Sequence, residues 1–357
     1  MKRTTTAVWM DNHKRWQINV QKDCERRSFY SSTPGRDGKR ECHRKADQWL
    51  DDNITDQNVR FSTLYKEYVE NLKLTTSKSN WSKIDCDGRN WIIPVIGKKK
   101  ISSLTEQNLQ SVIDKAYAAG LAKKTLSNIK AVLTSFMKYC RRKKVSTLLP
   151  ENLNIPKGAK IGEKRILQPD DLTKLFTVDT TMMRGKRIED KYINAYRFHV
   201  LTGLRPGELM GLEWTDIIGN MVYIKRSINQ FREITKGKNN NAIRHFALTD
   251  IAQQVILEQK NISKTNSVFE IERQQTYAKY WERYCAANNI PHVSLYEMRH
   301  TFVSIAKNLS SGQIRPLIGH SKNMDTFGTY GHEMKGELQN TAQQLNGLFY
   351  DILKSVL

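Results

Sequence analysis

The chain has 357 residues and a formal net charge of +22, with 39% hydrophobic residues. This length favours two or three domains with packed cores, and no apolar run approaches the roughly 20 residues that a membrane span requires. The first residues lead into no apolar signal segment, so we expect a cytoplasmic protein without a membrane partner. The positive charge indicates a nucleic acid as partner, the alternative being a basic protein that binds none.

The five cysteines are odd in number, widely spaced and without a Cys-x-x-Cys pair. They are Cys24, Cys42, Cys86, Cys140 and Cys285. This pattern predicts reduced thiols and neither a disulfide framework nor a zinc site.

Residues 1–55 predict a small α+β unit. Apolar and polar residues alternate over residues 15–21 and around residues 28–30, as expected of strands in a small sheet. Residues 32–38 are rich in loop formers, and residues 39–50 predict a helix with one apolar face.

Residues 61–150 predict an all-helical unit. Apolar residues recur at helical spacing over 61–72, 109–116 and 126–137, which indicates three buried helix faces. Lysines occupy polar positions between them, and residues 98–100 and 141–144 are basic clusters beside helix ends. Such clusters on several helices of one bundle favour phosphate contacts, although solvated helix faces are the alternative.

A linker is expected over residues 149–164, which contain two Pro and two Gly. The strand-like residues 165–167 follow, and Pro169 with the acids after it suits a helix start. Further on, an apolar helical run over 195–201 reaches a C-cap at Thr202-Gly203.

The first candidate site residue is Arg205, in the sequence Thr-Gly-Leu-Arg-Pro-Gly-Glu. Pro206 suits the first turn of a new helix, and Glu208 suits its positive end. Arg205 therefore lies on a tight connection, close to a helix N-terminus that favours anions.

A β region is predicted between this motif and the C-terminal part. Residues 221–228 are β-prone, and residues 244–249 are expected to form the partner strand. Residues 235–242 between them are dense in turn formers and contain Lys236 and Lys238.

The stretch from 294 to 332 holds the other candidates, which are Arg299, His300, His320, Tyr330 and His332. Arginine and histidine side chains in such number suit a phosphate site. A tyrosine with cationic neighbours can then act as a nucleophile. Each residue alone is more often structural, and only the set together with Arg205 carries weight.

The order Thr-Gly-Leu-Arg-Pro-Gly-Glu, basic hairpin, Arg-His, Gly-His and Tyr resembles that of the tyrosine recombinases, the phage integrase family. The match is strong in the C-terminal half, and the N-terminal half is similar in layout to integrases of conjugative transposons and temperate phages. The resemblance implies an arm-type DNA-binding domain (1–55, a three-stranded sheet plus a helix), a helical core-binding domain (61–150) and a mainly α catalytic domain (163–357) with a small antiparallel β-sheet.

The resemblance also implies an activity, the cleavage and rejoining of DNA through a 3′-phosphotyrosyl intermediate. Arg205 and Arg299 would clamp the phosphate oxygens, His320 would donate a hydrogen bond, and Tyr330 would attack. A lysine of the hairpin would protonate the departing 5′ oxygen, and spacing favours Lys238 over Lys236.

One position departs from the family pattern. Where the family usually has His, three positions before Arg299, this chain has Tyr296, a poor base near neutral pH. We expect Tyr296 to be a weaker contributor that still contacts phosphate. His300 is expected to pack structurally, and His332 to orient the nucleophile or to play no part.

The implied function is the integration and excision of a mobile genetic element. The partners expected from the resemblance are double-stranded DNA at core and arm sites, three further copies in a homotetramer, an excisionase and a host DNA-bending protein. No cofactor or metal is expected, because the ester keeps the bond energy and arginines can supply the charge of a metal. The alternatives are a type IB topoisomerase and a DNA-binding protein with a decayed site.

The tail after Tyr330 predicts an amphipathic helix, with apolar residues at helical spacing over 338–353. Such a face must be buried. It can fold back on its own domain, but the resemblance favours docking on a neighbouring protomer in the tetramer.

Overall fold

The computed structural model describes residues 5–22, 25–51, 59–235, 243–319 and 336–354. The chain divides into two compact units, residues 1–162 and 163–357. The described residues form three separate hydrophobic clusters. Helices predominate, with small antiparallel sheets between them. Within the described ranges, no helix is long and apolar enough to cross a membrane.

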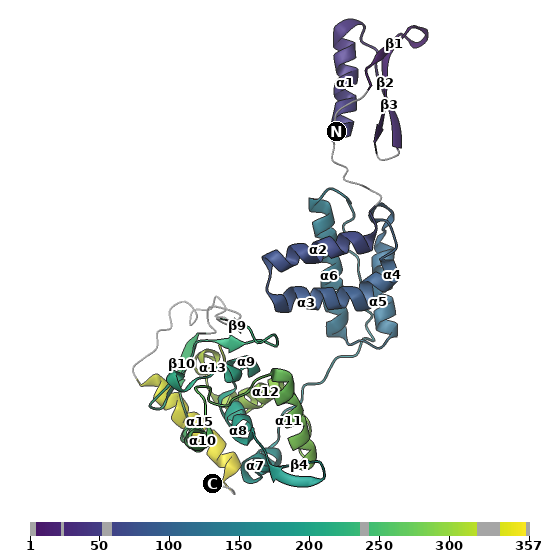
Figure 1. Cartoon of the computed structure of the whole chain (residues 1–357). Helices are drawn as coiled ribbons and strands as arrows, with labels where there is room; N and C mark the ends of the chain where they lie inside the picture. Colours follow the sequence, from purple (N-terminus) through teal and green to yellow (C-terminus); the bar gives the residue numbers. More distant parts are fainter. Residues whose placement is uncertain (1–4, 23–24, 52–58, 236–242, 320–335, 355–357) are drawn as a thin grey trace. The chain divides into compact units, whose positions relative to one another are not determined.

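The N-terminal part of the first unit is a three-stranded sheet with a helix packed on one face (Figure 1). Its elements are β1 (Val8–Met10), β2 (Arg15–Lys22), β3 (Glu25–Ser31) and α1 (Gly35–Asp51). Ile18 and Val20 are buried beneath the helix, which confirms the predicted alternation in β2. The loop predicted over residues 32–38 is confirmed for residues 32–34 and is wrong for residues 35–38, because α1 already begins at Gly35. Asp37 in its first turn offsets the positive end of the helix.

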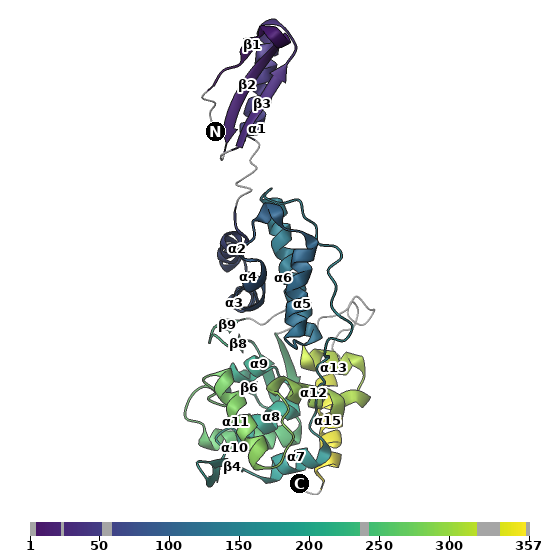
Figure 2. The ribbon, with the colours of Figure 1, turned by 90° about the vertical axis from the view of Figure 1, so that its right-hand side faces the viewer.

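The remainder of the first unit is a helical bundle. Its elements are α2 (Phe61–Thr75), α3 (Lys78–Asp87), a π-helical turn (Gly88–Ile92), α4 (Ile93–Ile96), α5 (Glu106–Ala118) and α6 (Lys123–Arg142). The three predicted apolar faces are confirmed, since Phe61, Leu109 and Phe136 are all fully buried in one cluster. Figure 2 shows α5 and α6 side by side, as their contacts require.

The predicted linker is in large part packed against this bundle. Leu153 and Ala159 belong to the core of the bundle. The side chain of Gln110 donates to the Asn154 carbonyl at 3.0 Å and accepts from the Asn154 N–H at 2.8 Å. These partners satisfy the irregular backbone, so the Pro and Gly content of the segment does not make it a free connection.

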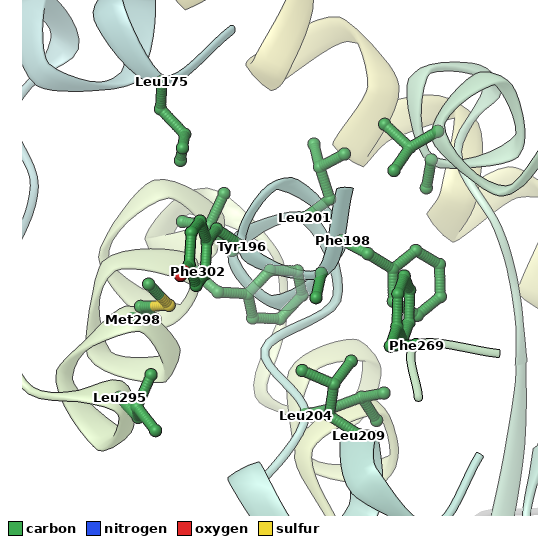
Figure 3. Close-up of a cluster of buried hydrophobic side chains, with 14 of the residues drawn as sticks. Leu175, Tyr196, Phe198, Leu201, Leu204, Leu209, Phe269, Leu295, Met298 and Phe302 are labelled. Carbon is green, nitrogen blue, oxygen red and sulfur yellow. The ribbon is translucent and has the colours of Figure 1, made fainter. Parts of the chain in front are cut away.

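The second unit is built around α8 (Ile193–Thr202), in which every residue after Ile193 is buried. The helices around it are α7 (Pro169–Thr177), α9 (Pro206–Met210), α10 (Asp250–Ile262), α11 (Gln274–Ala287), α12 (Leu295–Ile305), α13 (Ser311–Ile318) and α15 (Glu337–Leu353). Figure 3 shows Phe198 pointing from α8 toward Phe269, with 5.3 Å between ring centroids, and Tyr196 pointing to the other side. A helix that is buried all round forms the centre of a domain core.

The predicted β region is confirmed, with one correction. β7 (Met221–Ile224) pairs with β10 (Arg244–Ala247), and β6 (Ile217–Ile218) pairs with the other edge of β7. The expected single strand over 221–228 divides, and its second piece, β8 (Ser227–Ile228), pairs with β9 (Ile234–Thr235) in a separate ribbon.

Two further differences lie near α12 and α11. The strand-like residues 165–167 form no strand, because the N–H groups of Arg165 and Leu167 donate to side chains of α12. A hairpin of β4 (Thr180–Met183) and β5 (Lys186–Glu189), which contacts α11, was not predicted. Its strands are short, and a four-residue pattern has little periodicity.

The predicted amphipathic helix at the C-terminus is confirmed as α15, and docking on a neighbouring protomer stays a prediction. In the single chain, Leu345, Phe349 and Leu353 are buried in the core of their own unit. The ring centroids of Phe349 and Phe302 lie 6.4 Å apart. The single chain therefore has the fold-back arrangement, in which the apolar face of α15 fills a core of its own unit.

Candidate active site

Arg205 lies where α8 ends and α9 begins. Gly203 ends α8 in the left-handed region with φ of +60°, and a Cβ there would lie 2.4 Å from the ring of Phe302. Only glycine meets both demands. Pro206 opens α9, and the N–H of Arg205 donates to Glu208 Oε2 at 2.9 Å. The predicted C-cap and helix start are confirmed, and they hold the backbone of Arg205 in place.

Three arginine side chains converge on the C-terminal end of α13. Arg244, Arg299 and Arg205 each donate a hydrogen bond to one of three successive carbonyl groups, those of residues 317, 318 and 319 respectively. Carbonyl groups at a helix C-terminus lack intrahelical partners and carry negative partial charge, so cations stabilise them. The next residue is His320, so the three arginines hold the chain immediately before a predicted site residue.

Glu208 links two of these arginines from a buried position, with only 2% of its surface exposed. Its Oε1 accepts from Arg205 Nη1 at 2.7 Å and from Arg244 Nη1 at 3.0 Å, and its Oε2 accepts from Arg244 Nη2 at 2.9 Å. Burial alone would raise the pKa of Glu208, but hydrogen bonds and attraction from Arg244 and then Arg205 outweigh it and lower the pKa. The charged carboxylate therefore fixes both guanidinium groups.

Arg299 is only 2% exposed, so its charged guanidinium group lies in the interior. Its Nη1 donates to the Gly203 carbonyl at 2.9 Å, so it also holds the turn that precedes Arg205. Burial, and then repulsion by Arg205, lower the pKa of Arg299 to about 10, which leaves it protonated near neutral pH. Among the described residues, Glu208 is the carboxylate that pairs with Arg205 and Arg244, and the Arg205 side chain is 24% exposed. The cluster can therefore bind an anion from solvent.

His199 is a further residue of this site that the sequence interpretation missed. It is fully buried in α8, and burial lowers its pKa to about 4, so the ring is neutral near pH 7. Its Nε2 lies 2.9 Å from the Leu204 carbonyl, which can only accept, so Nε2 carries the proton. The imidazole thus holds the residue immediately before Arg205. No sequence signal marks it, because it stands within an apolar helical run.

Tyr296 and Arg299 lie three positions apart on α12, and Tyr296 is 47% exposed. Its ring meets that of His300 edge-on, with 5.4 Å between centroids. Burial, followed by repulsion from Lys164, lowers the pKa of His300, so its ring tends toward the neutral form. Both residues are close enough to Arg299 to interact with its charge, and the Tyr296 side chain is accessible to a ligand from solvent.

The other predicted site residues, Lys236, Lys238, His320, Tyr330 and His332, lie outside the described residues, and their roles stay predictions. The sequence also drew attention to two described residues, but it did not indicate that they belong to the site. Glu208 was placed only as a helix-terminal acid, and Arg244 only as the start of a strand. The signal available was the spacing of three positions between Arg205 and Glu208, which puts the two side chains on one helical turn.

Metal ligands do not gather in the part of the chain that the structure describes, where no group of three or more His, Cys, Asp or Glu residues could hold an ion. Of the cysteines, Cys42, Cys86, Cys140 and Cys285 are described, and all four are free thiols. In the described site, positive charge is supplied by the arginines.

Two family models match the sequence. The model of the phage integrase family matches residues 165–337, and that of the phage integrase N-terminal SAM-like domain matches residues 60–117. The chain is similar to a XerC-like tyrosine recombinase of Caldanaerobacter subterraneus subsp. tengcongensis, with 22% identity over 91% of this chain and 92% of the relative. It is also similar to the ICEBs1 integrase of Bacillus subtilis, with 19% identity over 82% and 84% of the two chains.

Solved structures share the fold. An integrase of the transposon Tn1549 in complex with a circular intermediate DNA matches with a TM-score of 0.63 and 15% identity, over 80% of this chain and 99% of that one. A lambda integrase tetramer bound to a Holliday junction matches with a TM-score of 0.61 and 13% identity, over 91% and 98% of the two chains.

Proposed function

We propose that Tyr330 cleaves DNA at a phosphate held by Arg205 and Arg299, since the chain belongs to the phage integrase family of tyrosine recombinases and is a site-specific recombinase. The reaction would integrate and excise a mobile genetic element. The observation that carries the residue assignment is the convergence of both arginines on the end of α13, directly before His320.

The roles follow from where charge develops. Attack by the Tyr330 hydroxyl on a phosphodiester increases the negative charge on the non-bridging oxygens, which preorganised arginines stabilise. A guanidinium has five N–H donors, and the described hydrogen bonds of Arg205 and of Arg299 use two side-chain N–H groups each. Donors therefore remain for phosphate oxygens, and His320 would add one more.

The leaving group is the 5′ oxygen of the DNA. We assign its protonation to Lys238, with Lys236 as the alternative in the same turn. Tyr296 would donate a weak hydrogen bond to the phosphate from its exposed position one turn from Arg299. The free 5′ hydroxyl of a partner duplex then attacks the phosphotyrosyl link and rejoins the strands, so the number of ester bonds is conserved.

Residues 1–55 would be the arm-type DNA-binding domain. The sheet face opposite α1 carries three cross-strand pairs with polar or aromatic side chains: Gln17 with Tyr30, Asn19 with Ser28, and Gln21 with Arg26. Asn19 Oδ1 accepts hydrogen bonds from Gln17 Nε2 at 3.2 Å and Ser28 Oγ at 2.6 Å, so these groups are ordered. Amide and guanidinium groups are suited to reading base edges in the major groove.

Residues 61–150 would be the core-binding domain. Lys98–Lys100 are exposed directly after α4, at one end of a bundle helix. In the second basic cluster, Arg141 donates to the Leu148 carbonyl at 2.8 Å and Lys143 pairs with Glu67, so these two also hold the bundle together. Cations at helix ends are suited to sequence-independent phosphate contacts.

The proposed working form is a homotetramer on double-stranded DNA. Support comes from the lambda integrase relative, which is a tetramer bound to a Holliday junction. An excisionase and a host DNA-bending protein remain predictions from the family resemblance, as does a cytoplasmic location.

Strand exchange between two short defined duplexes tests the proposal. A recombinase yields hybrid duplexes, a type IB topoisomerase relaxes supercoiled DNA without hybrid products, and a decayed protein only binds. The Tyr330→Phe variant should bind DNA normally and form no covalent adduct on a nicked suicide substrate, because it lacks only the hydroxyl. An adduct trapped from this variant would exclude Tyr330 as the nucleophile.

A further inference from the structure

A basic pocket of about 420 Å³ lies between the tip of the β8–β9 ribbon and the start of α11. Its lining includes Arg232 from the ribbon tip, Arg273 at the N-cap of α11 and Lys279 on α11. Within the described ranges, none of these three cations forms an ion pair. The pocket therefore has an excess of positive charge and no described carboxylate paired with it.

The ribbon tip is a folded turn organised by Asn229. Its Oδ1 accepts from the backbone N–H groups of Phe231 at 2.9 Å and Glu233 at 3.1 Å. Its Nδ2 donates to Glu233 Oε2 at 2.9 Å, so the nearby carboxylate is engaged with the turn itself. Arg232 consequently has a defined backbone position, with φ of +64°.

The ribbon is fixed to the helix that begins beside Arg205. A Cβ on Gly207 in α9 would lie 2.5 Å from Ser227 Oγ and 2.6 Å from the Ile228 carbonyl oxygen of β8. From Ile228 to Arg232 the chain spans at most about 13 Å, at about 3.3 Å per residue. One DNA strand rises by about 3.4 Å per nucleotide, so this distance corresponds to a few nucleotides. The pocket therefore lies a few nucleotides from a phosphate bound at Arg205.

We propose that this pocket binds one backbone phosphate of the DNA, a few nucleotides from the cleaved bond. The inference rests on the proposed recombinase function, because the same duplex supplies both phosphates. Arg232 and Arg273 offer planar donor groups that match phosphate oxygens, and Lys279 adds a point charge. The partly buried ring of Phe231 forms part of the wall, and the three cations are exposed, so a phosphate can reach them from solvent. A contact outside the reacting phosphate sets the position of the duplex on the catalytic unit.

The test compares two triple variants of the full chain that lose the same charge. The pocket variant is Arg232→Asn, Arg273→Gln and Lys279→Gln, in which Asn tolerates the left-handed backbone at 232. The control variant changes three exposed lysines of the same unit, Lys260→Gln, Lys307→Gln and Lys354→Gln. Equal thermal unfolding temperatures of the two variants establish that both are folded.

The first measurement is the dependence of core-site binding on salt. The slope of log K against log salt changes by about 0.9 for each phosphate contact. We expect the magnitude of this slope to be smaller by about 0.9 in the pocket variant than in the control variant. Equal slopes for the two variants overturn the proposal.

The second measurement uses duplexes with one neutral methylphosphonate at successive positions. We expect one position near the cleavage site to weaken binding of the wild type and the control variant about tenfold, and to leave the pocket variant unaffected. Calorimetry with inorganic phosphate separates the two sources of a phosphate group. Binding of inorganic phosphate to the pocket, with no methylphosphonate position that depends on it, assigns the pocket to a free anion and overturns the DNA proposal.

Failure of the pocket proposal can be distinguished from failure of the proposed function. If wild-type protein forms the Tyr330 adduct but no methylphosphonate position depends on the pocket, only the pocket proposal fails. If no adduct forms with the wild type, the recombinase mechanism fails, and with it the premise of the pocket proposal.

Discussion

Replacement of Glu208 by Gln tests whether one buried carboxylate organises the arginine cluster. The carboxylate is 2% exposed and accepts three side-chain hydrogen bonds, one from Arg205 and two from Arg244. Glutamine keeps the shape of the side chain but has no charge, and its NH₂ group replaces one acceptor with a donor. That donor faces guanidinium N–H groups, so at least one charge-assisted hydrogen bond is lost.

The expected destabilisation follows from these contacts. A hydrogen bond to a charged group contributes about 1.5–3 kcal/mol, and removing one partner of a buried ion pair costs about 3–5 kcal/mol. We expect the free energy of unfolding to fall by about 3 kcal/mol, since glutamine retains part of the hydrogen bonding. For a unit of this size, residues 163–357, this lowers the unfolding temperature by roughly 6–12 °C.

The contribution of Glu208 should also depend on pH. Its pKa in the folded protein is lowered, whereas the unfolded value is about 4.3. The stabilisation is therefore fully present above the unfolded pKa and is lost as the pH falls through the lower folded pKa. The difference in unfolding temperature between wild type and Glu208→Gln should be constant near neutral pH and shrink in acid.

The assays are thermal unfolding and single-turnover cleavage of a nicked suicide duplex. Because Arg205 loses its orienting partner, cleavage should slow at least about tenfold. Glu213→Gln is the matched control, since Glu213 pairs with Arg226 at 2.9 Å but its side chain is 36% exposed. An exposed pair contributes up to about 1 kcal/mol, so the control should change little. Unfolding temperatures and cleavage rates that are equal for the two variants would refute the organising role of Glu208.

Three further predictions concern individual site residues. Arg205→Ala and Arg299→Ala should each slow cleavage at least about a hundredfold. Lysine at either position should restore only part of the rate, because a point charge lacks the guanidinium fork. Near-wild-type cleavage by either Ala variant would show that the clamp lies elsewhere. Lys238→Ala should slow cleavage and recover on a substrate with a 5′-thiol leaving group, which needs no proton, whereas recovery of Lys236→Ala alone would transfer the role to Lys236. His199→Leu should slow cleavage without weakening DNA binding. His199→Gln should recover most of the rate, because its amide can donate to the Leu204 carbonyl. An equal loss of rate in both variants would contradict a positioning role.

The local part of this architecture could be predicted from the sequence. The C-cap at Gly203, the helix start at Pro206 and the apolar faces of the bundle depend on residues a few positions apart. The order of Arg205, Arg299, His320 and Tyr330 also identified the family before the fold was considered. Where the expected strand divides after Ile224, its second piece pairs with β9 and not with β10, so pairing with another segment decided the boundary.

What the tertiary structure alone decided is how distant groups meet. The Arg299 side chain bonds a carbonyl 96 residues away, and Glu208 bonds Arg244 across 36 residues. No local periodicity encodes these pairs, because they depend on how whole helices pack. The same holds for α15, where an apolar helical face requires burial without specifying which surface buries it. The sequence therefore indicated most of the elements and the candidate reactive groups, and packing determined their partners, because side-chain contacts between distant segments exist only after the core has formed.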